Sequence, residues 1–428
     1  MRPFWRVIAA FVGMLSLGAS SASAADSIVL LREGVSPQQK ADRAGVSVTQ
    51  MYAHLGAFAA ELSPRQRSAL KSDRDVLSIT IDRGLSAQPD PVLRRQKIPV
   101  EPFGTTQVIP TGVRRIDGLA SPSADIDGID ERVDVDVAIF EDTLDPSHPD
   151  VNVAGNVDCA PGAAVPDWHA MHSAGVVGAL DNGRGVVGVA PGARIWGVDM
   201  FYGPGSTRLS WILCGLDWLI ANADMLEVVN WSVGFTGFDD PNCGVDPPDP
   251  VHAGICRSVE KGTTWVVSAG NESVDAVDVV PAAYDEVIAV SALADYDGRP
   301  GGLGQQTCLQ GVFDLGADDT FAAYSNFGAD VDLMAPGNCI LSTSAANAIK
   351  AADAVTNVYR DGSDLYAVSN GTSFSSPHVA GAAALYAAQH PQASPSQVLA
   401  ALRANRETGH VPGDPDGIDE GIVNVAGF

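Results

Sequence analysis

The chain has 428 residues, of which 46% are hydrophobic and 18% are charged, and this balance is typical of a globular protein rather than a disordered one. Its formal net charge at pH 7 is −26, from 52 acidic side chains against 26 lysines and arginines. Such a charge repels nucleic acids and anionic membranes, which excludes both from the expected partners.

The first 24 residues are expected to be a signal peptide. Arg2 and Arg6 precede an apolar run over 7–17, and a small-residue cleavage site, Ala-Ser-Ala, follows at 22–24. The apolar run is shorter than the roughly 20 residues that a membrane-spanning helix needs, and no later stretch reaches that length. The sequence therefore predicts a secreted, extracellular protein without a membrane anchor.

Residues 27–82 are expected to form a small α+β unit of their own. The stretches 28–31 and 77–81 are typical of strands, and Ser63 is placed to cap a helix that runs through Leu70.

A linker is expected to follow this unit. The stretch 86–110 contains five prolines and, at 94–97, the basic cluster Arg-Arg-Gln-Lys. Such a composition predicts an exposed, cleavable segment. We therefore divide the chain into a signal peptide over 1–24, a propeptide and linker over 25–106, and a larger domain over 107–428.

Apolar stretches alternate with helical ones from residue 133 onward. The strands are hydrophobic along their whole length, as in parallel sheets that helices cover on both faces. This pattern predicts an α/β fold, a three-layer sandwich with a mostly parallel central sheet and its site at the carboxyl ends of the strands. The expected strands are 133–140, 194–200, 228–233, 263–268 and 286–293, and the expected helices are 172–180, 209–223, 374–389 and 396–405.

Export makes the six cysteines readable as disulfides. Six cysteines allow 15 pairings, and proximity alone favours Cys243 with Cys256 and Cys308 with Cys339. Cys214 lies within an apolar helical pattern, which equally suits a buried free thiol. No Cys-x-x-Cys pair occurs, so a zinc knuckle is not expected.

Ser373 stands where a helix begins, after Asn370-Gly371-Thr372. A serine hydroxyl is a poor nucleophile until a base removes its proton, so it needs a histidine that the fold brings near. Glycine lets a substrate approach the backbone, and the N-terminus of a helix favours a developing negative charge. The residues themselves thus indicate a nucleophilic serine.

The segment 370–381 resembles the nucleophile motif of the subtilisin-like serine proteases (the subtilase, or peptidase S8, family), from which it differs mainly at Phe374 and Ser375. The resemblance covers about 107–428, and the preceding unit looks like the family's inhibitory propeptide. Further blocks similar to the family's occur in the expected order, at 183–191, 230–234, 268–271 and 321–343.

The resemblance implies roles for individual residues. Ser373 would be the nucleophile, and Asn271 would donate its side-chain amide to the oxyanion together with the backbone N–H of Ser373. In the segment 169–175, His169 aligns with the general base and His172 is a second, structural histidine. A His-x-x-His metal site is the competing interpretation, but no further ligand at suitable spacing supports it. Ala170 and Met171 replace the family's small pair, which is expected to add bulk beside the cleft.

The substrate would lie along the same cleft as an added β-strand. The residues expected to bind it are Ser232, Val233 and Gly234 along one edge, and Ser268, Ala269 and Gly270 opposite them.

The triad acid is the departure from the family pattern. The family places an aspartate seven residues before the histidine of His-Pro-Asp, and His148 begins such a segment here. Counting back without a gap leads to Glu141, whereas Asp142 fits only after a one-residue deletion. We favour Glu141, because a glutamate can orient the histidine if the backbone retreats by the length of one bond.

The chemistry requires no cofactor, and the sequence leaves structural calcium open without fixing a metal site. Calcium is common in the family, and acidic loops at 239–240, 246–249 and 414–420 could supply oxygen ligands or be solvated turns.

The resemblance implies a secreted serine endopeptidase that matures by cleaving off its own propeptide and acts as a monomer on proteins or peptides. The alternative is a catalytically impaired member of the fold that binds peptides or proteins, because the acid and the segment around His169 are altered. An α/β-hydrolase esterase is disfavoured, since no Gly-x-Ser-x-Gly elbow occurs.

Overall fold

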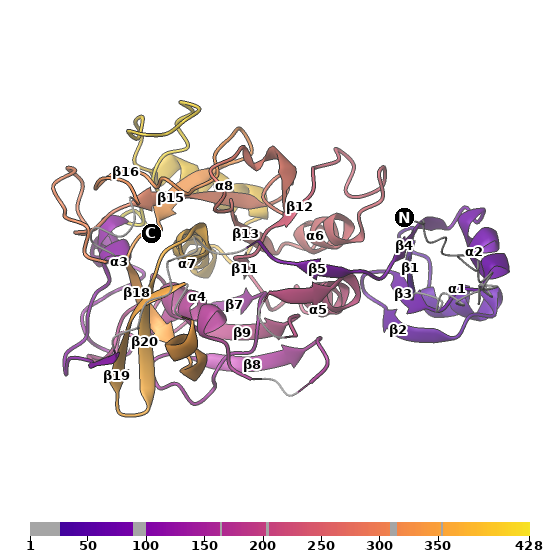
Figure 1. Cartoon of the computed structure of the whole chain (residues 1–428), viewed down its shortest axis with the longest axis horizontal. Helices are drawn as coiled ribbons and strands as arrows, with labels where there is room; N and C mark the ends of the chain where they lie inside the picture. Colours follow the sequence, from indigo (N-terminus) through magenta and orange to yellow (C-terminus); the bar gives the residue numbers. More distant parts are fainter. Residues whose placement is uncertain (1–25, 89–99, 163–164, 203–204, 309–314, 352–353) are drawn as a thin grey trace, which may run out of the picture.

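The computed structural model describes residues 26–88, 100–162, 165–202, 205–308, 315–351 and 354–428. The expected signal peptide and the basic cluster at 94–97 lie outside these residues. A small N-terminal unit sits at one end of a much larger one (Figure 1). Among the described residues, no helix is both long and apolar enough to cross a membrane.

The N-terminal unit is a four-stranded antiparallel sheet in the order β2-β3-β1-β4 with two helices. Its strand β1 alternates, so that Ile28 and Leu30 pack against the larger unit while Val29 and Leu31 pack beneath the unit's own helices. The elements are β1 (Ser27–Leu31), α1 (Pro37–Ala44), β2 (Val48–Tyr52), β3 (Ala57–Ala60), α2 (Pro64–Lys71) and β4 (Val76–Ile81). The cap predicted at Ser63 is present as a capping box with Gln66.

The larger unit is built on an eight-stranded sheet in the order β16-β15-β13-β11-β7-β9-β8, with β17 also pairing β15. Its pairs are parallel except for β15 with β16, which confirms the predicted mostly parallel α/β sheet. The strands are β7 (Asp136–Ile139), β8 (Val153–Asp158), β9 (Arg194–Asp199), β11 (Val228–Trp231), β13 (Thr264–Ser268), β15 (Ile288–Ala294), β16 (Thr320–Phe321) and β17 (Leu333–Pro336).

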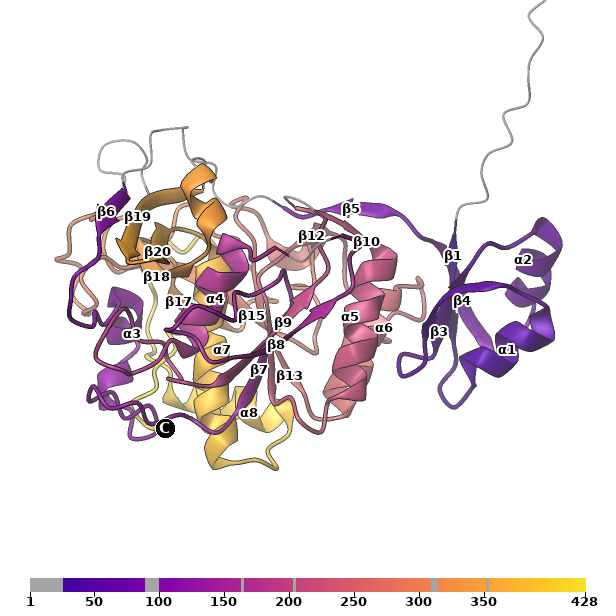
Figure 2. The same cartoon turned by 90° about the horizontal axis from the view of Figure 1, so that it is seen from below.

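Helices cover both faces of this sheet and complete the three layers (Figure 2). One face packs against α4 (Trp168–Gly178), α7 (Thr372–Gln389) and α8 (Pro395–Asn405), and the other against α5 (Leu209–Ala221) and α6 (Pro250–Glu260). The expected helix at 172–180 begins earlier, because the Asp167 carboxylate accepts the backbone N–H of His169 and caps α4. The cores on the two faces are therefore separate clusters, divided by the sheet.

Smaller elements surround the sheet. A second sheet in the order β18-β20-β19-β6 and the pairs β5 with β10 and β12 with β14 lie outside it. Part of the expected linker is thus a strand, since β6 runs parallel to β19. The bounds are β5 (Gly84–Ser86), β6 (Val100–Pro102), α3 (Thr111–Arg115), η1 (Gly118–Ala120), β10 (Ser206–Arg208), β12 (Phe235–Thr236), η2 (Ala276–Asp278), β14 (Val279–Val280), β18 (Ile340–Ser344), η3 (Ala346–Lys350), β19 (Val355–Asp361) and β20 (Asp364–Ser369).

All six cysteines are paired. The disulfides expected from proximity, Cys243–Cys256 and Cys308–Cys339, are confirmed. The third bond joins Cys159, just after β8, to Cys214 in α5, so the interpretation of Cys214 as a free thiol is wrong. The two residues are 55 positions apart, and only the fold brings their Cα atoms to 5.6 Å.

Candidate active site

Three neighbouring strands of the large sheet end at one place. Glu141 follows β7, Ser232 follows β11, and Gly270 and Asn271 follow β13. Because these strands are adjacent and parallel, the residues after them gather at the same edge of the sheet. The first turns of α4 and α7 bring His169 and Ser373 to this edge as well, since α4 and α7 pack on each other across Phe374.

The Glu141 carboxylate is in contact with the His169 ring. Its Oε2 lies 2.7 Å from Nδ1 of His169, while its Oε1 accepts the backbone N–H of Ser232 at 3.3 Å and the Asn230 amide at 3.4 Å. The glutamate is only 1% exposed, and it remains bonded through both oxygens. The carboxylate is thus held in place from two sides and fixes the orientation of the imidazole.

Asp142, the other candidate acid, lies in a different environment. Burial, together with the charges of Asp167 and Asp199, raises the pKa of Asp142 to about 8. Near neutral pH the two adjacent carboxyl groups therefore differ, because Asp142 is largely protonated. Of the two, Glu141 is the one whose oxygen is within hydrogen-bond distance of the His169 ring.

His169 is flanked by aromatic rings. Trp168 and Phe374 have ring centroids at 5.4 and 5.2 Å from that of His169, in tilted or edge-on arrangements. Only about a fifth of the His169 side chain, 18%, remains exposed. Packing against Trp168 and Phe374 therefore holds the His169 imidazole with its Nδ1 edge toward Glu141.

The second histidine of the segment is structural. His172 is fully buried, and its Nε2 lies 3.0 Å from the carbonyl oxygen of Ile340. Burial lowers the pKa of His172 to about 3, so the ring is neutral. Ala170 and Met171 are fully buried too. The expectation that this pair adds bulk beside the cleft is wrong, because both side chains point into the core of the α4 face.

Ser373 is the second residue of α7 and lies against the end of β11. Its hydroxyl donates to the carbonyl oxygen of Ser232 at 3.2 Å, and its side chain is almost buried. Beneath it, the Ser232 and Ser376 hydroxyls are 3.0 Å apart, and Ser376 donates to Asn230. This buried hydroxyl network fixes the position of β11 relative to the start of α7.

Asn271 is oriented by the residue before Ser373. Its Oδ1 accepts both the backbone N–H and the hydroxyl of Thr372, each at 2.9 Å. Because the carbonyl end of the side chain is held this way, its NH₂ end is the one turned away from Thr372. The preceding Gly270 has φ +105°, and a Cβ there would lie 2.3 Å from the Asn326 amide, so only glycine fits.

The segments expected to bind substrate differ in what they can offer. Ala269 is fully buried in a small cluster with Ala276 and Val331, and the Gly270 carbonyl accepts the Asn326 N–H. Ser268 lies at the end of β13 and is likewise buried. Any part that 268–270 plays in binding is therefore a matter of backbone and shape rather than of side chains.

The opposite edge, at Ser232 to Gly234, is already in contact with another segment of the chain, residues 84–88. The backbone N–H of Gln88 donates to the carbonyl oxygen of Gly234 at 2.9 Å, and Ala87 donates to Gly205 at 3.0 Å. Just before them, β5 pairs antiparallel with β10. A Cβ on Gly234 would lie 2.6 Å from Oε1 of Gln88, the far end of a flexible side chain, so a larger residue there would require the Gln88 side chain to move. Val233, which lies between Ser232 and Gly234 in the chain, is buried in the core on the α5 and α6 face of the sheet.

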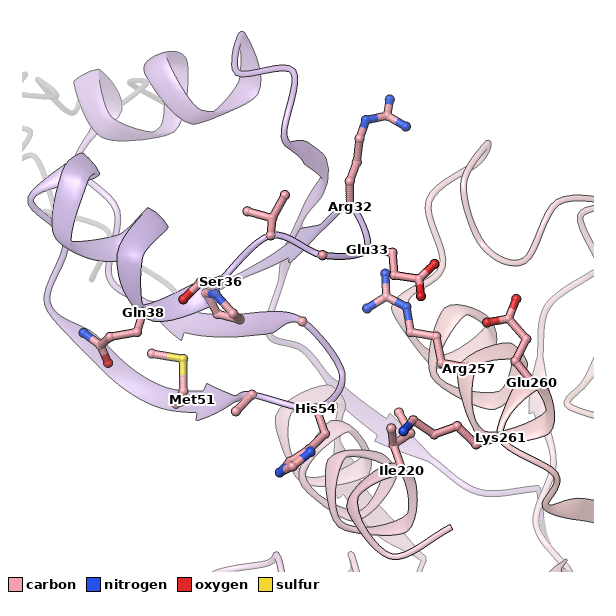
Figure 3. Close-up of a pocket in the computed structure, with 15 residues that line it drawn as sticks. Arg32, Glu33, Ser36, Gln38, Met51, His54, Ile220, Arg257, Glu260 and Lys261 are labelled. Carbon is pink, nitrogen blue, oxygen red and sulfur yellow. The ribbon is translucent and has the colours of Figure 1, made fainter. Parts of the chain in front are cut away.

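The N-terminal unit docks on α5 and α6. Asp217 accepts the backbone N–H groups of His54 and Leu55, both at 2.7 Å, and Arg257 donates to the Leu31 carbonyl oxygen at 2.9 Å and to that of Leu55. A cavity of about 760 Å³ lies beside these contacts, with Arg257 pointing into it from α6 (Figure 3). None of the residues predicted for the site lines this cavity, which belongs to the interface between the two units.

Sequence reasoning did not single out several residues that shape the site. Asn230, Thr372 and Ser376 all lie inside the quoted motifs, so the motifs marked them, but their contacts with Glu141, Asn271 and Ser232 could not be seen in the sequence. Gln88 carried no signal at all, because its contact with Gly234 is made through the backbone.

Known proteins are similar in sequence to most of this chain. The model of the "Subtilase family" matches residues 132–421. "Subtilisin NAT" of Bacillus subtilis subsp. natto is 29% identical over 388 residues, covering 89% of this chain and 82% of that protein. "Subtilisin" of Bacillus pumilus is 30% identical over 326 residues, which is 74% of this chain and 98% of the relative. "Subtilisin DY" of Bacillus licheniformis is 31% identical over 297 residues, 68% and 89% of the two chains.

Proposed function

The chain belongs to the subtilase family and is a serine endopeptidase, and from this premise we propose that Ser373, His169 and Glu141 form its catalytic triad. The observation that carries the proposal is the 2.7 Å contact between Glu141 Oε2 and His169 Nδ1, beside the helix α7, whose second residue is Ser373. A buried carboxylate on Nδ1 leaves Nε2 of the ring as the atom that accepts a proton.

In this mechanism Ser373 Oγ attacks the carbonyl carbon of the substrate while His169 Nε2 takes the hydroxyl proton. The carbonyl π electrons move to oxygen, and the resulting oxyanion accepts hydrogen bonds from the Asn271 amide and the Ser373 N–H. Glu141 stabilises the imidazolium that has formed. The imidazolium then gives its proton to the leaving amine, which departs and leaves an acyl-enzyme on Ser373. Water, deprotonated by the same ring, then attacks the acyl carbon; the bond to Ser373 Oγ breaks, the ring returns the proton to Oγ, and the acid leaves.

The propeptide is proposed to inhibit the enzyme by occupying the substrate cleft. Residues 84–88 support this, because they run as an added strand against β10 and Gly234. The match over 89% of the chain also extends beyond 107–428 into the N-terminal unit. Self-cleavage within 89–99, the part of the proline-rich linker between Gln88 and β6, would separate the two units.

Export, action on protein or peptide substrates and a monomeric state complete the proposal and remain predictions. The substrate residues are proposed as the backbone edge of Ser232, Val233 and Gly234 with the opposite segment, Ser268 to Gly270.

The decisive substitution is Ser373→Ala. The full-length variant should neither cleave itself nor be labelled by a fluorophosphonate, whereas the wild-type chain should do both. Gel electrophoresis of purified protein and fluorescence of the labelled band measure the two events. If the variant still matured without added protease, self-processing would be wrong. A casein-clearing assay separates an active enzyme from the catalytically impaired binding protein.

A further inference from the structure

The C-terminal loop 414–420 concentrates negative charge. It carries four carboxylates, Asp414, Asp416, Asp419 and Glu420, within seven residues. The loop is tied to the core on both sides, because the Pro412 carbonyl oxygen accepts the Phe321 N–H, and the residues at 421 and 423 hydrogen-bond with Met334 of β17. The acidic side chains therefore cannot spread apart freely.

Three of these carboxylates converge on one point. Asp414, Asp416 and Glu420 each direct an oxygen into a group whose members all lie within 4.8 Å of one another. Glu420 is only 5% exposed, and its Oε1 is buried without a hydrogen-bond partner. Oδ2 of Asp414 is buried and unpartnered in the same way. A buried, unpaired carboxylate oxygen is costly, and here two members of the same three-carboxylate group each have one.

The surrounding charges do not compensate for this cluster. Burial raises the pKa of Glu420 to about 8, with the charges of Asp414, Asp416 and Asp419 adding to the effect. Burial also raises the pKa of Asp414, which the neighbouring His410 lowers only in part.

The other acidic clusters contain an imidazole or accept backbone N–H groups, although Asp239 Oδ1 and Asp240 Oδ2 are also buried without a hydrogen-bond partner. Asp240 bonds to the buried His252, whose other nitrogen meets Glu286, and Asp249 caps α6 and accepts the Tyr284 hydroxyl. In a third cluster, Asp295, Asp297 and Asp318, the two buried carboxylates accept backbone N–H groups. The group of Asp414, Asp416 and Glu420 differs from the first of these clusters in containing no imidazole, and from the third in having two buried oxygens, Asp414 Oδ2 and Glu420 Oε1, without a hydrogen-bond partner.

We propose that Asp414, Asp416 and Glu420 bind one calcium ion. Three carboxylates without nitrogen or sulfur form a donor set for a hard cation, and calcium accepts the irregular geometry that a loop provides more readily than magnesium does. Gly417, with φ +75°, turns the chain between the exposed Asp416 and the buried Glu420. The site would fasten the loop that follows α8 to β17.

The test uses the full-length protein with Ser373→Ala, which prevents self-cleavage and so makes the result independent of the proposed protease mechanism. Isothermal titration with calcium chloride and the thermal unfolding midpoint are measured in chelated buffer at pH 7.5. Calcium should bind with a dissociation constant of about 1 mM or tighter and raise the midpoint. Magnesium at the same concentration should bind more weakly.

Glu420→Gln and Asp416→Asn should each weaken this calcium binding by about tenfold or more, because each removes a charged ligand. Asp416 is exposed, so its variant folds even if Glu420→Gln does not. In chelated buffer above pH 8, Glu420→Gln should be at least as stable as the parent, because it removes a buried charge. With calcium it should be the less stable of the two.

Asp297→Asn is the matched control, since it removes an exposed carboxylate from the cluster with Asp295 and Asp318. It should leave the calcium affinity and the midpoint shift unchanged. The proposal is overturned if calcium fails to raise the midpoint of the parent. It is equally overturned if Asp416→Asn binds calcium as tightly as the parent, or if Asp297→Asn loses as much affinity as Asp416→Asn.

Discussion

In the proposed triad, Glu141 takes the place at which the family uses the shorter aspartate. The additional methylene carries its carboxylate to 2.7 Å from the His169 ring, while the backbone N–H of Ser232 and the Asn230 amide hold the other oxygen. The same contacts that orient the carboxylate also connect it to β11, whose end receives the Ser373 hydroxyl. The end of β11 thus connects Glu141, which contacts His169, with Ser373.

Glu141→Gln should therefore lower kcat by about 10⁴-fold, the order of the loss on removing this acid in other serine proteases, including a subtilisin. An amide holds the imidazole less well and cannot stabilise the imidazolium. Asp142→Asn is the matched comparison, and it should keep kcat within a few-fold at pH 7. Hydrolysis of a chromogenic peptide gives both values, and equal losses in the two variants would reject Glu141 as the acid.

Ionisation of Asp142 should instead affect how the stability of the fold changes with pH. Its pKa in the fold is raised to about 8, against an ordinary value of 3.8, so the folded state binds a proton that the unfolded state has lost. The stability that this gives is complete below about pH 4 and is lost as the pH rises through 8. Asp142→Asn should make the unfolding midpoint of the Ser373→Ala protein less sensitive to pH between 4 and 9. A slope identical to that of the parent would contradict the assignment.

At the scale of elements, the N-terminal unit is held by backbone contacts at the ends of its strands. Asp217 in α5 accepts two N–H groups from the turn between β2 and β3, and residues 84–88 extend the contact as a strand. Since the N-terminal unit contributes backbone atoms to these hydrogen bonds, the contacts depend on its backbone conformation more than on its side chains.

Asp217→Ala should weaken the complex between the cleaved propeptide and the enzyme by about tenfold or more, because two hydrogen bonds to a charged group are lost. Activity should then appear sooner after the cleavage band is seen on a gel. Asp224→Ala changes the same charge at an exposed position beyond the end of α5 and should leave this delay unchanged. An unaltered delay in Asp217→Ala would show that the contact does not govern release.

Several elements could be predicted because their signals are local. The apolar strands of the central sheet and the capped helix α2 lie within a few residues of their expected bounds. Helix α1 was missed because Pro37, Lys40 and Ala41 are its buried residues, which is too weak an apolar pattern to recognise.

The site was predictable to a similar degree. Ser373, His169 and Asn271 lie in distinctive motifs, so their positions could be inferred. The choice between Glu141 and Asp142 depends on one residue of register and on burial, which are properties of the fold. The burial of Ala269 and Met171 could not be read from their motifs either, because small and flexible apolar residues suit a cleft wall and a core equally well.

At the scale of the whole molecule, the disulfides have distinct tasks. Cys159–Cys214 fastens α5 to the end of β8, on the face where the N-terminal unit docks. Cys308–Cys339 instead borders the nucleophile loop, since the Cys339 N–H donates to the Asn370 side chain at 2.8 Å.

Replacing either pair by serine should cost up to about 4 kcal/mol of stability, from the length of the loop that each closes. Only the Cys308/Cys339 variant should also lose kcat at temperatures where the protein is folded, because Asn370 leads directly into Gly371 and Ser373. Urea unfolding and peptide hydrolysis measure the two effects. If both variants kept full kcat, or both lost it equally, this division would be wrong.

The alternating strand β1 has a consequence for the fate of the N-terminal unit. Ile28, Leu30 and Tyr52 are fully buried only because α5 and α6 cover them. Once the unit is cut free and leaves, this apolar face meets water, and a domain of that size has little other core to offset the exposure. In the proposed maturation, the detached unit would itself become a substrate, and its degradation would keep it from binding the enzyme again, so that activation would run in one direction.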